Sequence, residues 1–275
     1  MTTRPKSVIS LISYDAHMLP SSRRSYYNDV DEIVLGLDEN RISWSQNSFV
    51  FDEKKLWSEL KNIDVDNKIV IIEDNFHRSS APIENDTHER NFLKHNCSTD
   101  WIFSFDADEI LINPKEFFED FCPIVQQYDD IELMFTWFLM YKSTNAGQLV
   151  ISDETRKHIF KKDIQGFSAH RDLQTFTYCR WTNSQKKILS PLAIKHYSFS
   201  RSDSELKTKI NNFGHSAESK QDPFYTTRQL VNEQNYKELL NFKTSGMGAQ
   251  WPTLKLIPEE QLDAFLYEEA KRIYD

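Results

Sequence analysis

Glycine is scarce in this chain. Six glycines are spread over 275 residues, and none of them forms a GxGxxG, GxxxxGKS or GxxxxGKT pattern. In those loops, backbone N–H groups bind the phosphates of dinucleotides or nucleoside triphosphates. The sequence therefore excludes both kinds of loop, and any phosphate bound here has to be neutralised by a metal ion and basic side chains.

Cysteines and long apolar runs are also lacking. Cys97, Cys122 and Cys179 are odd in number and widely spaced, which excludes a disulfide framework and a CxxC metal site. No apolar run reaches the roughly 18 residues of a membrane span, and residues 8–12 are too short for the core of a signal peptide. We therefore expect a cytoplasmic protein with reduced thiols, which meets a membrane only peripherally, at its cytoplasmic face.

Positive charge is in deficit. The chain contains 33 Lys and Arg residues against 42 Asp and Glu residues, which gives a formal net charge of −9. Because binding to nucleic acid through a broad surface requires a positive face, we expect no nucleic-acid partner. The 39% of hydrophobic and 27% of charged residues are typical of a globular protein with a substantial core.

Apolar runs and amphipathic segments alternate in the first half of the chain. The predicted strands cover residues 7–14, 32–38, 68–73, 101–106 and 131–141. Helical patterns lie between them at residues 52–63 and 86–94, the second with Asp86 and Glu89 as its capping pair. The alternation predicts an α/β fold, in which helices flank a mostly parallel central sheet on both faces.

The pattern changes beyond residue 142, where Ser, Thr, Asn and Gly cluster and the apolar runs become short. We predict a first half over residues 1–145, a second half of the same domain over residues 146–215, and a helical C-terminal extension over residues 216–275. Ser202 and Glu205 form a capping box, which predicts the start of a helix within the second half.

Three carboxylates follow the predicted strand at residues 101–106. Asp106 and Asp108 are two positions apart, so in an extended segment both side chains leave the same side of the backbone, and Glu109 follows directly. Such a pair suits Mn²⁺ or Mg²⁺, which shares its remaining coordination positions with substrate phosphates. A solvated acidic turn is the alternative, but open α/β sheets bind ligands at the carboxyl ends of their strands.

Polar side chains end the other predicted strands too. Tyr14 and Asp15 follow the first strand, and Asp38 ends the second. In a parallel sheet these residues lie at one edge, where a nucleotide would bind, although a single acid at a strand end is more often a turn former. Arg90, on the preceding predicted helix, is a candidate for neutralising phosphate, with a solvated helix charge as the alternative.

His196 lies inside the apolar run at residues 192–199. A histidine in such a run is either a hydrogen-bonded core residue or a ligand, and beside a metal at Asp106 and Asp108 its imidazole would be an acceptable third ligand for Mn²⁺. Lys195 and the basic residues after it form a local basic cluster in an acidic chain. This cluster would hold an anionic leaving group or form a solvated helix face.

The order of these motifs resembles the GT-A fold of nucleotide-sugar glycosyltransferases, and within that class the bacterial family 2-like enzymes with a DxD motif. The resemblance covers residues 7–215 and is strongest at Trp101-Ile-Phe-Ser-Phe-Asp-Ala-Asp-Glu-Ile-Leu111, with a late Lys-His-Tyr-Ser at residues 195–198. It implies a GT-A-like, Rossmann-like fold. Residues 1–145 would bind the nucleotide sugar, and residues 146–215 would face the acceptor.

The resemblance also implies roles for individual residues. The implied metal ligands, for Mn²⁺ or Mg²⁺, are Asp106, Asp108 and His196. The implied donor-binding residues are Tyr14, Asp15, Asp38, Arg90, Asp106 and Lys195. An inverting transfer requires a base near the acceptor hydroxyl. The segment at residues 166–172 resembles the place of that base, which would be Asp172, with Glu154 as the alternative.

The resemblance therefore predicts a metal-dependent, inverting glycosyltransferase of bacterial surface polysaccharide or glycoconjugate synthesis. Its donor would be a UDP-linked sugar, and its acceptor a saccharide or glycolipid. Two other classes stay open. One is a haloacid-dehalogenase-like phosphohydrolase that uses Asp106 as nucleophile and Asp108 as general acid. The other is a carbohydrate-binding protein without catalytic activity.

Overall fold

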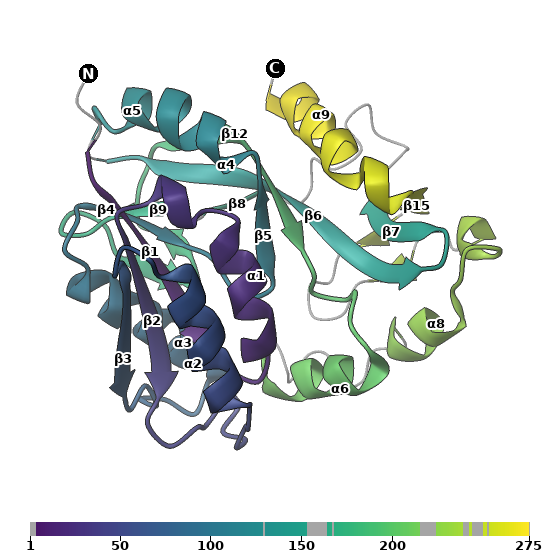
Figure 1. The fold of residues 1–275 in the computed structure, drawn as a ribbon, viewed down its shortest axis with the longest axis horizontal. Coiled ribbons are helices and arrows are strands. Elements are labelled where there is room, and N and C mark those ends of the chain that lie inside the picture. Colours follow the sequence, from purple (N-terminus) through teal and green to yellow (C-terminus); the bar gives the residue numbers. More distant parts are fainter. Residues whose placement is uncertain are drawn as a thin grey trace.

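A computed structural model describes residues 4–128, 130–152, 164–166, 168–214, 224–238, 242–243, 250–251 and 253–274. The strands of its first sheet follow the order β3-β2-β1-β4-β9 (Figure 1). They are β1 (Lys6–Ile12), β2 (Glu32–Asp38), β3 (Ile69–Asp74), β4 (Trp101–Ser104) and β9 (Ser168–His170). The first four are parallel and β9 is antiparallel to β4, so β1 lies where the strand order reverses.

A second, mixed sheet has the order β15-β7-β6-β12-β5, with β8 beside β6. Its strands are β5 (Glu109–Ile112), β6 (Glu132–Thr144), β7 (Gly147–Ser152), β8 (Ile164–Gly166), β12 (Lys187–His196) and β15 (Thr253–Ile257). Strands β6 and β12 are parallel, and the other pairs are antiparallel. Because β4 ends at Ser104 and β5 begins at Glu109, the chain crosses from one sheet to the other within the DxD motif.

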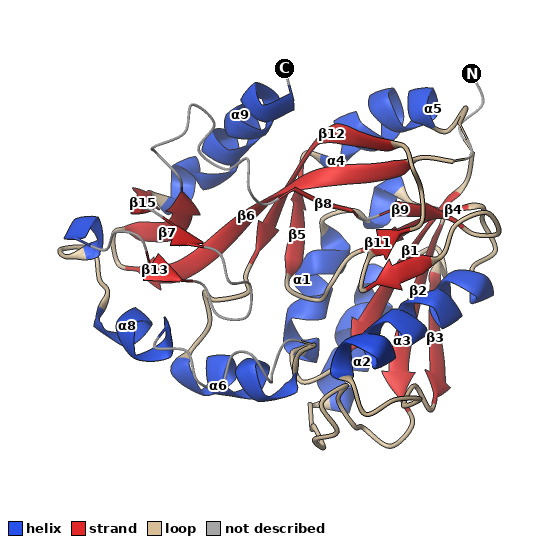
Figure 2. Cartoon of the chain, turned by 180° about the vertical axis from the view of Figure 1, so that it is seen from behind, coloured by secondary structure: helices blue, strands red, loops and turns tan. Residues whose placement is uncertain are grey.

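Helices flank both sheets (Figures 1 and 2). Those of the first half are η1 (Ala16–Met18), α1 (Leu19–Arg24), η2 (Tyr27–Asp29), α2 (Glu53–Ile63), α3 (Pro82–Asn96), α4 (Pro114–Glu116), η3 (Phe117–Phe121) and α5 (Cys122–Val125). Those of the second half are α6 (Asp203–Asn212), α8 (Phe224–Leu230), η4 (Tyr236–Glu238), η5 (Glu259–Gln261) and α9 (Leu262–Tyr274). Two small antiparallel strand pairs complete the described elements: β10 (Phe176–Tyr178) with β11 (Trp181–Thr182), and β13 (Phe242–Lys243) with β14 (Gln250–Trp251).

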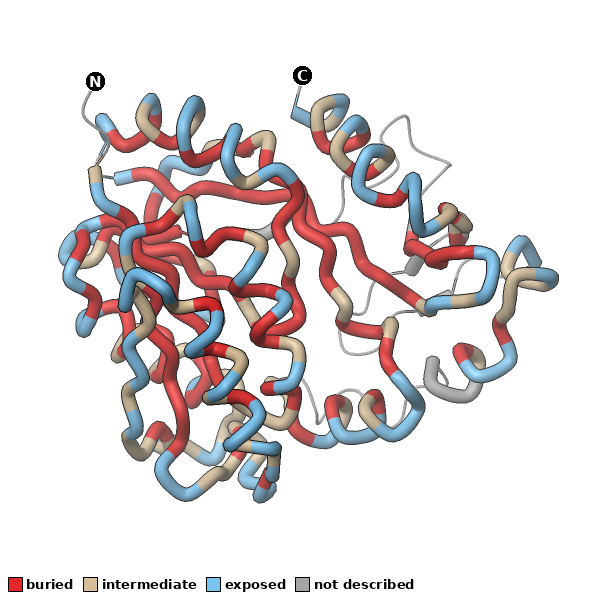
Figure 3. Tube along the Cα trace, in the orientation of Figure 1, coloured by how far each residue is buried: buried red, intermediate tan, exposed pale blue. Residues whose placement is uncertain are grey.

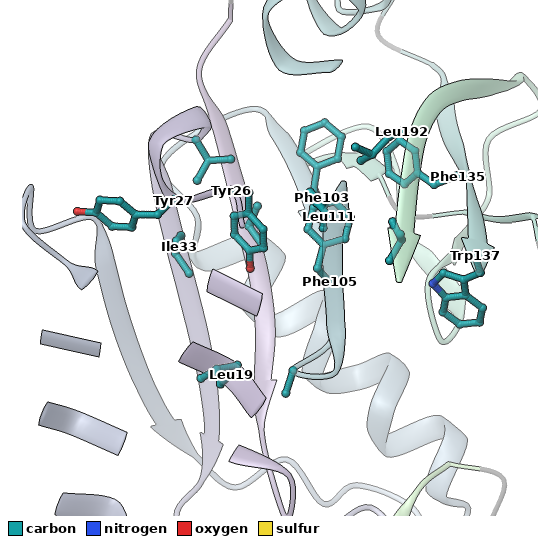
Figure 4. Packing of buried hydrophobic residues seen from close by; sticks show 14 of the residues in the cluster. Leu19, Tyr26, Tyr27, Ile33, Phe103, Phe105, Leu111, Phe135, Trp137 and Leu192 are labelled. Atoms are coloured by element: carbon teal, nitrogen blue, oxygen red, sulfur yellow. The ribbon is translucent and has the colours of Figure 1, made fainter. Parts of the chain in front are cut away.

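Alternating residues of the first sheet belong to two apolar layers, one on each face, as expected of strands covered on both faces. Val8 and Ile12 join the side chains of α1 and α2, whereas Ile9 and Leu11 join those of α3 and β10. A group of phenylalanines connects the two sheets, with Phe103, Phe105 and Phe135 in ring contact (Figure 4). Both sheets are buried over most of their length (Figure 3).

The predicted fold class is confirmed in its architecture: the chain has an α/β fold with a mostly parallel first sheet, flanking helices and a C-terminal helix. The predicted capping box at Ser202 and Glu205 is present at the start of α6. The cap expected at Asp86 is wrong, because α3 begins four residues earlier, with Pro82 in its first turn. The division at residues 145 and 215 stays a prediction. No helix among the described residues is long and apolar enough to cross a membrane.

Candidate active site

A cavity of about 420 Å³ opens at the carboxyl ends of β1 and β4. Tyr14 and Asp15 line it from the segment after β1, and Asp106 and Asp108 line it from the segment after β4. The cavity is completed by the β10–β11 turn, the end of β12 and helix α6. It therefore lies at the point where the order of the parallel strands reverses, which is where open α/β sheets bind their ligands.

Asp106 is held by two arginines. Arg90 Nη2 donates to Asp106 Oδ1 at 2.8 Å, and Arg180 Nη2 lies 3.5 Å from Oδ2. Arg90 is itself fixed by Asp86 at 2.6 Å and by the Ser104 hydroxyl at 2.5 Å. Burial would raise the pKa of Asp106, but Arg180 and Arg90 outweigh it and lower the pKa to about 2. Asp106 is therefore ionised at neutral pH and bound by protein cations.

Asp108 is likewise surrounded by nitrogen atoms. Its Oδ2 accepts from Lys209 Nζ at 2.6 Å and from Arg201, while His196 Nε2 lies 3.5 Å from Oδ1. Arg201 also binds Asp15 at 2.9 Å. Burial would raise the pKa of Asp108, but Lys209, His196 and Arg201 hold it well below its usual value.

Glu109, the third carboxylate of the motif, does not line the cavity. It is fully buried, and both of its oxygens accept from Arg180 Nη1, at 2.9 and 2.8 Å. Its Oε2 also accepts the backbone N–H of Asp106 at 2.8 Å. Burial raises the pKa of Glu109, and Arg180 opposes that rise. Glu109 therefore fixes both the backbone of the DxD motif and the guanidinium of Arg180 from the buried side of the cavity wall.

Arg180 is the central residue that the sequence patterns do not reveal. It lies at the tip of the β10–β11 hairpin, where Tyr178 pairs with Trp181 and Cys179 adopts a positive φ of 52°. The turn inserts the guanidinium between Asp106 and Glu109 and places it 4.7 Å from the ring centroid of Trp137. The one local signal is an arginine with aromatic residues one position after it and two positions before it, in the sequence Tyr-Cys-Arg-Trp.

Aromatic rings form much of the remaining lining. They come from the segments after β1 and β2, from β6, from the β10–β11 hairpin and from the segments around α6, and they are Tyr14, Trp44, Trp137, Tyr178, Trp181, Phe199 and Phe213. Such rings bury large apolar faces and suit the stacking of a flat base or the apolar face of a sugar. The cavity thus combines stacking surfaces with a dense charge network.

The structure brings several predicted residues together. Tyr14, Asp15, Arg90 and the two DxD aspartates all line the cavity. His196 lines it too, with its ring centroid 4.3 Å from that of Trp137. His196 therefore lies at the cavity, and its role as a metal ligand stays a prediction.

Two predicted donor-binding residues lie elsewhere. Lys195 precedes His196 on β12 and points to the other face of the sheet, where its Nζ donates to Asp263 of α9 at 2.7 Å. Asp38 is buried and does not line the cavity. Its Oδ1 accepts the backbone N–H groups of Asn40 and Ile42, both at 3.0 Å. It acts here as a turn former.

The structure does not bring Asp172 into the cavity. His170 of β9 pairs with Trp101 at the start of β4, so the segment after β9 lies at the end of β4 opposite to Asp106. Asp172 is exposed there and forms an ion pair with Arg171 at 3.1 Å. The alternative base, Glu154, lies outside the described residues.

The expected divalent cation does not fit the site as it is built. All four carboxylate oxygens of Asp106 and Asp108 already face a nitrogen of an arginine, lysine or histidine side chain. Within the part of the chain that the structure describes, no group of three or more His, Cys, Asp or Glu side chains is placed to hold a metal ion. Mn²⁺ or Mg²⁺ stays a prediction from the sequence.

No family model matches this sequence, and no curated protein matches it. Among solved structures, S. aureus TarS 1–349 is similar with 14% identity and a TM-score of 0.33, over 51% of this chain and 36% of TarS 1–349. Its complex with UDP-GlcNAc gives 14% identity and a TM-score of 0.32, over 52% and 36%. CMP:2-keto-3-deoxy-manno-octonic acid synthetase complexed with CTP gives 11% and 0.35, over 62% and 75%. Likenesses of this extent decide neither family nor activity, and the chain spans about a third of TarS 1–349.

Proposed function

We propose that the cavity binds a nucleotide-activated sugar and that the protein transfers this sugar to a hydroxyl group of an acceptor, with inversion. The observation that supports this most is the position of Tyr14, Asp15, Asp106 and Asp108. They come from two adjacent parallel strands and meet in one cavity where the strand order reverses. Nucleotides bind at this place in open α/β sheets.

The lining suits the two parts of such a donor. The aromatic rings offer faces for a nucleobase and for a sugar ring. Lys209 and Arg180 reach the cavity wall and would stabilise the negative charge that develops on a departing nucleoside diphosphate. We propose a UDP-linked donor and a saccharide or glycolipid acceptor, as expected of an enzyme that builds bacterial surface polysaccharide or glycoconjugates.

The transfer also needs a base that accepts the proton of the acceptor hydroxyl as the new bond forms. Of the two predicted bases, we retain Glu154 in the proposal, because Asp172 lies at the opposite end of β4. With such a base, the sugar would pass to the acceptor in one displacement, and the product would carry the inverted anomeric configuration.

A screen of nucleotides and nucleotide sugars by thermal shift, followed by calorimetry, tests the proposal. A ligand that binds only the folded state adds about 2.7 kcal/mol of stability at a concentration 100 times its Kd. We expect UDP and at least one UDP-sugar to raise the melting temperature, and the same UDP-sugar to be consumed when acceptors are supplied. A screen without any shift by a nucleotide or nucleotide sugar would contradict the proposal.

A pair of tryptophan variants places the binding. Trp181 lines the cavity, whereas Trp57 lies on α2 and packs against Phe51 outside it. We expect Trp181→Ala to weaken binding of the UDP-sugar about tenfold, the usual loss of one stacking platform, and Trp57→Ala to leave it unchanged. Equal affinities of both variants would place the ligand elsewhere.

A further inference from the structure

The charges at the cavity raise a question about the role of the DxD carboxylates. Two carboxylates that await a divalent cation remain free to bind it, yet Asp106 and Asp108 each bind two basic side chains. The pair of Asp108 and Arg201 is almost fully buried, with 2% exposure of each side chain. A metal ion between the carboxylates would leave these cations unpaired in a poorly solvated place, which is unfavourable.

Lys209 has spare hydrogen-bonding capacity, in contrast to Arg90. An ammonium group has three N–H donors. Among the described contacts, that of Lys209 makes one hydrogen bond, to Asp108, and the side chain lines the cavity. Arg90, in contrast, uses Nε, Nη1 and Nη2 on Asp86, Ser104 and Asp106. Lys209 is therefore able to donate to a ligand while it keeps its contact with Asp108.

Asp108 positions the ammonium group of Lys209 at the cavity wall. The same carboxylate is shared with Arg201 and faces His196, and Arg201 is held in turn by Asp15. Arg201 has Asp15 as a second counter-charge, so it does not depend on Asp108 alone, and the ammonium group of Lys209 keeps N–H donors for an anion in the cavity. Arg180 faces the same cavity from the hairpin, across the motif.

Resting on the proposed function, we propose that the diphosphate of the donor is bound by protein cations, with Lys209 as its direct contact. Asp108 is then the positioning carboxylate of Lys209 and not a metal ligand. It follows that a nucleoside diphosphate binds this protein without a divalent cation. The DxD motif keeps its place at the phosphates, but it acts through basic side chains.

Calorimetry of the full chain with UDP, once in EDTA and once in Mn²⁺, tests the proposal on the unmodified protein. We expect the two dissociation constants to agree within about threefold, because in this proposal no metal ion connects the diphosphate to the protein. Binding of UDP that is lost in EDTA and restored by Mn²⁺ would overturn the inference and leave the proposed function standing. Absence of UDP and UDP-sugar binding in both buffers would overturn the proposed function and the inference with it.

Lysine variants provide the second arm. Lys209→Gln should lower the affinity for UDP by at least about tenfold, as expected for a lost charge-assisted hydrogen bond. It should leave the affinity for uridine unchanged. Lys209→Arg should restore part of the loss. Lys207→Gln removes the same charge from an exposed position of the same helix and should bind UDP like the unmodified chain. Equal UDP affinities of Lys209→Gln and Lys207→Gln, with both proteins folded, would contradict the role of Lys209.

Discussion

Single residues at the site depend on one another for their charge. Glu109 has no exposed surface, and Arg180 is the cation that binds both of its oxygens. A buried carboxylate is stable in the ionised state only with such a partner, and loss of one partner leaves the other uncompensated. The contacts below the cavity therefore determine stability as well as binding.

Replacing Arg180 tests this dependence. Arg180→Ala should lower the free energy of unfolding by about 3–5 kcal/mol at pH 7, the usual result of breaking a buried pair from one side. At pH 5 the loss should be smaller, because burial already raises the pKa of Glu109 and the unpaired carboxyl then takes up a proton. Urea denaturation at both pH values measures the difference.

The matched control is Arg171→Ala. Arg171 also binds carboxylates, Asp172 and Asp100, but its side chain is 26% exposed and theirs are more exposed still. A surface pair of this kind contributes about 0–1 kcal/mol. If both alanine variants lost the same stability, the buried pair would have no special weight.

Because of Glu89, the stability of the fold should depend on pH with the opposite sign to that expected for an ordinary ion-paired acid. Burial raises its pKa to about 8, although the hydrogen bond from Trp44 opposes the rise. The folded state thus binds this proton more tightly than the unfolded state, whose pKa is near 4.5. The resulting stability is fully present below pH 4.5 and is lost as the pH rises towards 8.

Glu89→Gln should therefore lack this decline. We expect the unfolding free energy of the variant to gain on that of the unmodified chain between pH 5 and pH 8, as measured by urea denaturation across this range. Glu84→Gln, an exposed position on the same helix, should follow the unmodified chain throughout. A constant difference between Glu89→Gln and the unmodified chain would show that Glu89 titrates equally in both states.

The sequence allows prediction of these residues only where a local pattern marks them. Asp106 and Asp108 could be found because they end a run of strand-forming residues. Arg180 could not, because its contact with Glu109 joins positions 71 residues apart and depends on how a short hairpin docks. Asp38 shows the converse error, since a strand-end acid satisfies a turn as readily as a ligand.

At the scale of helices and strands, prediction succeeds where the signal lies within the element. Strand β2 matches the predicted residues 32–38, and the capping box of α6 is present at Ser202 and Glu205. Helix α3 was predicted to start too late, because Asp86 and Glu89 are capping types in sequence but bind Arg90 and Trp44 in the fold. A buried polar partner has the same composition as a cap, so sequence alone does not separate them.

The cap of α6 gives a prediction at this scale. Ser202→Ala removes the side chain that accepts the backbone N–H of Glu205, which should cost about 1 kcal/mol of stability. Because α6 carries Lys209, the same change should weaken UDP binding slightly. Urea denaturation and calorimetry measure the two effects. Lys207→Ala, at an exposed position of α6, should leave the UDP affinity unchanged and cost less stability than Ser202→Ala, and an equal loss of stability would refute the assignment of the cap.

For the whole molecule, the C-terminal helix is part of the second sheet's core. Leu262, Leu266 and Ala270 of α9 are buried in one cluster with Phe138 of β6 and Ala193 of β12. The predicted helical character of the C-terminal segment is confirmed for α9, and this helix covers one face of the second sheet. What the helix covers could not be predicted, because the pairing of β6, β7, β12 and β15 is non-local.

Leu266→Ala tests whether α9 unfolds with the sheet. The side chain is completely buried, so the substitution should cost about 2–5 kcal/mol. We expect one transition, with the same midpoint when followed by circular dichroism and by tryptophan fluorescence. Glu268→Ala, an exposed position of the same helix, should have little effect. Loss of helical signal before the fluorescence change would show that α9 melts separately.

The crossing of the chain between the two sheets restricts how this protein can vary. Residues 105–108 join β4 to β5, and β5 is fixed to β12 by the pairs Glu109 with His196 and Ile110 with Lys195. A single inserted or deleted residue in this segment would move β5 by one position and exchange its two faces. Glu109 would then turn away from Arg180. The length of this segment sets the register of β5 relative to β4, so its length should be far less tolerant of change than its side chains.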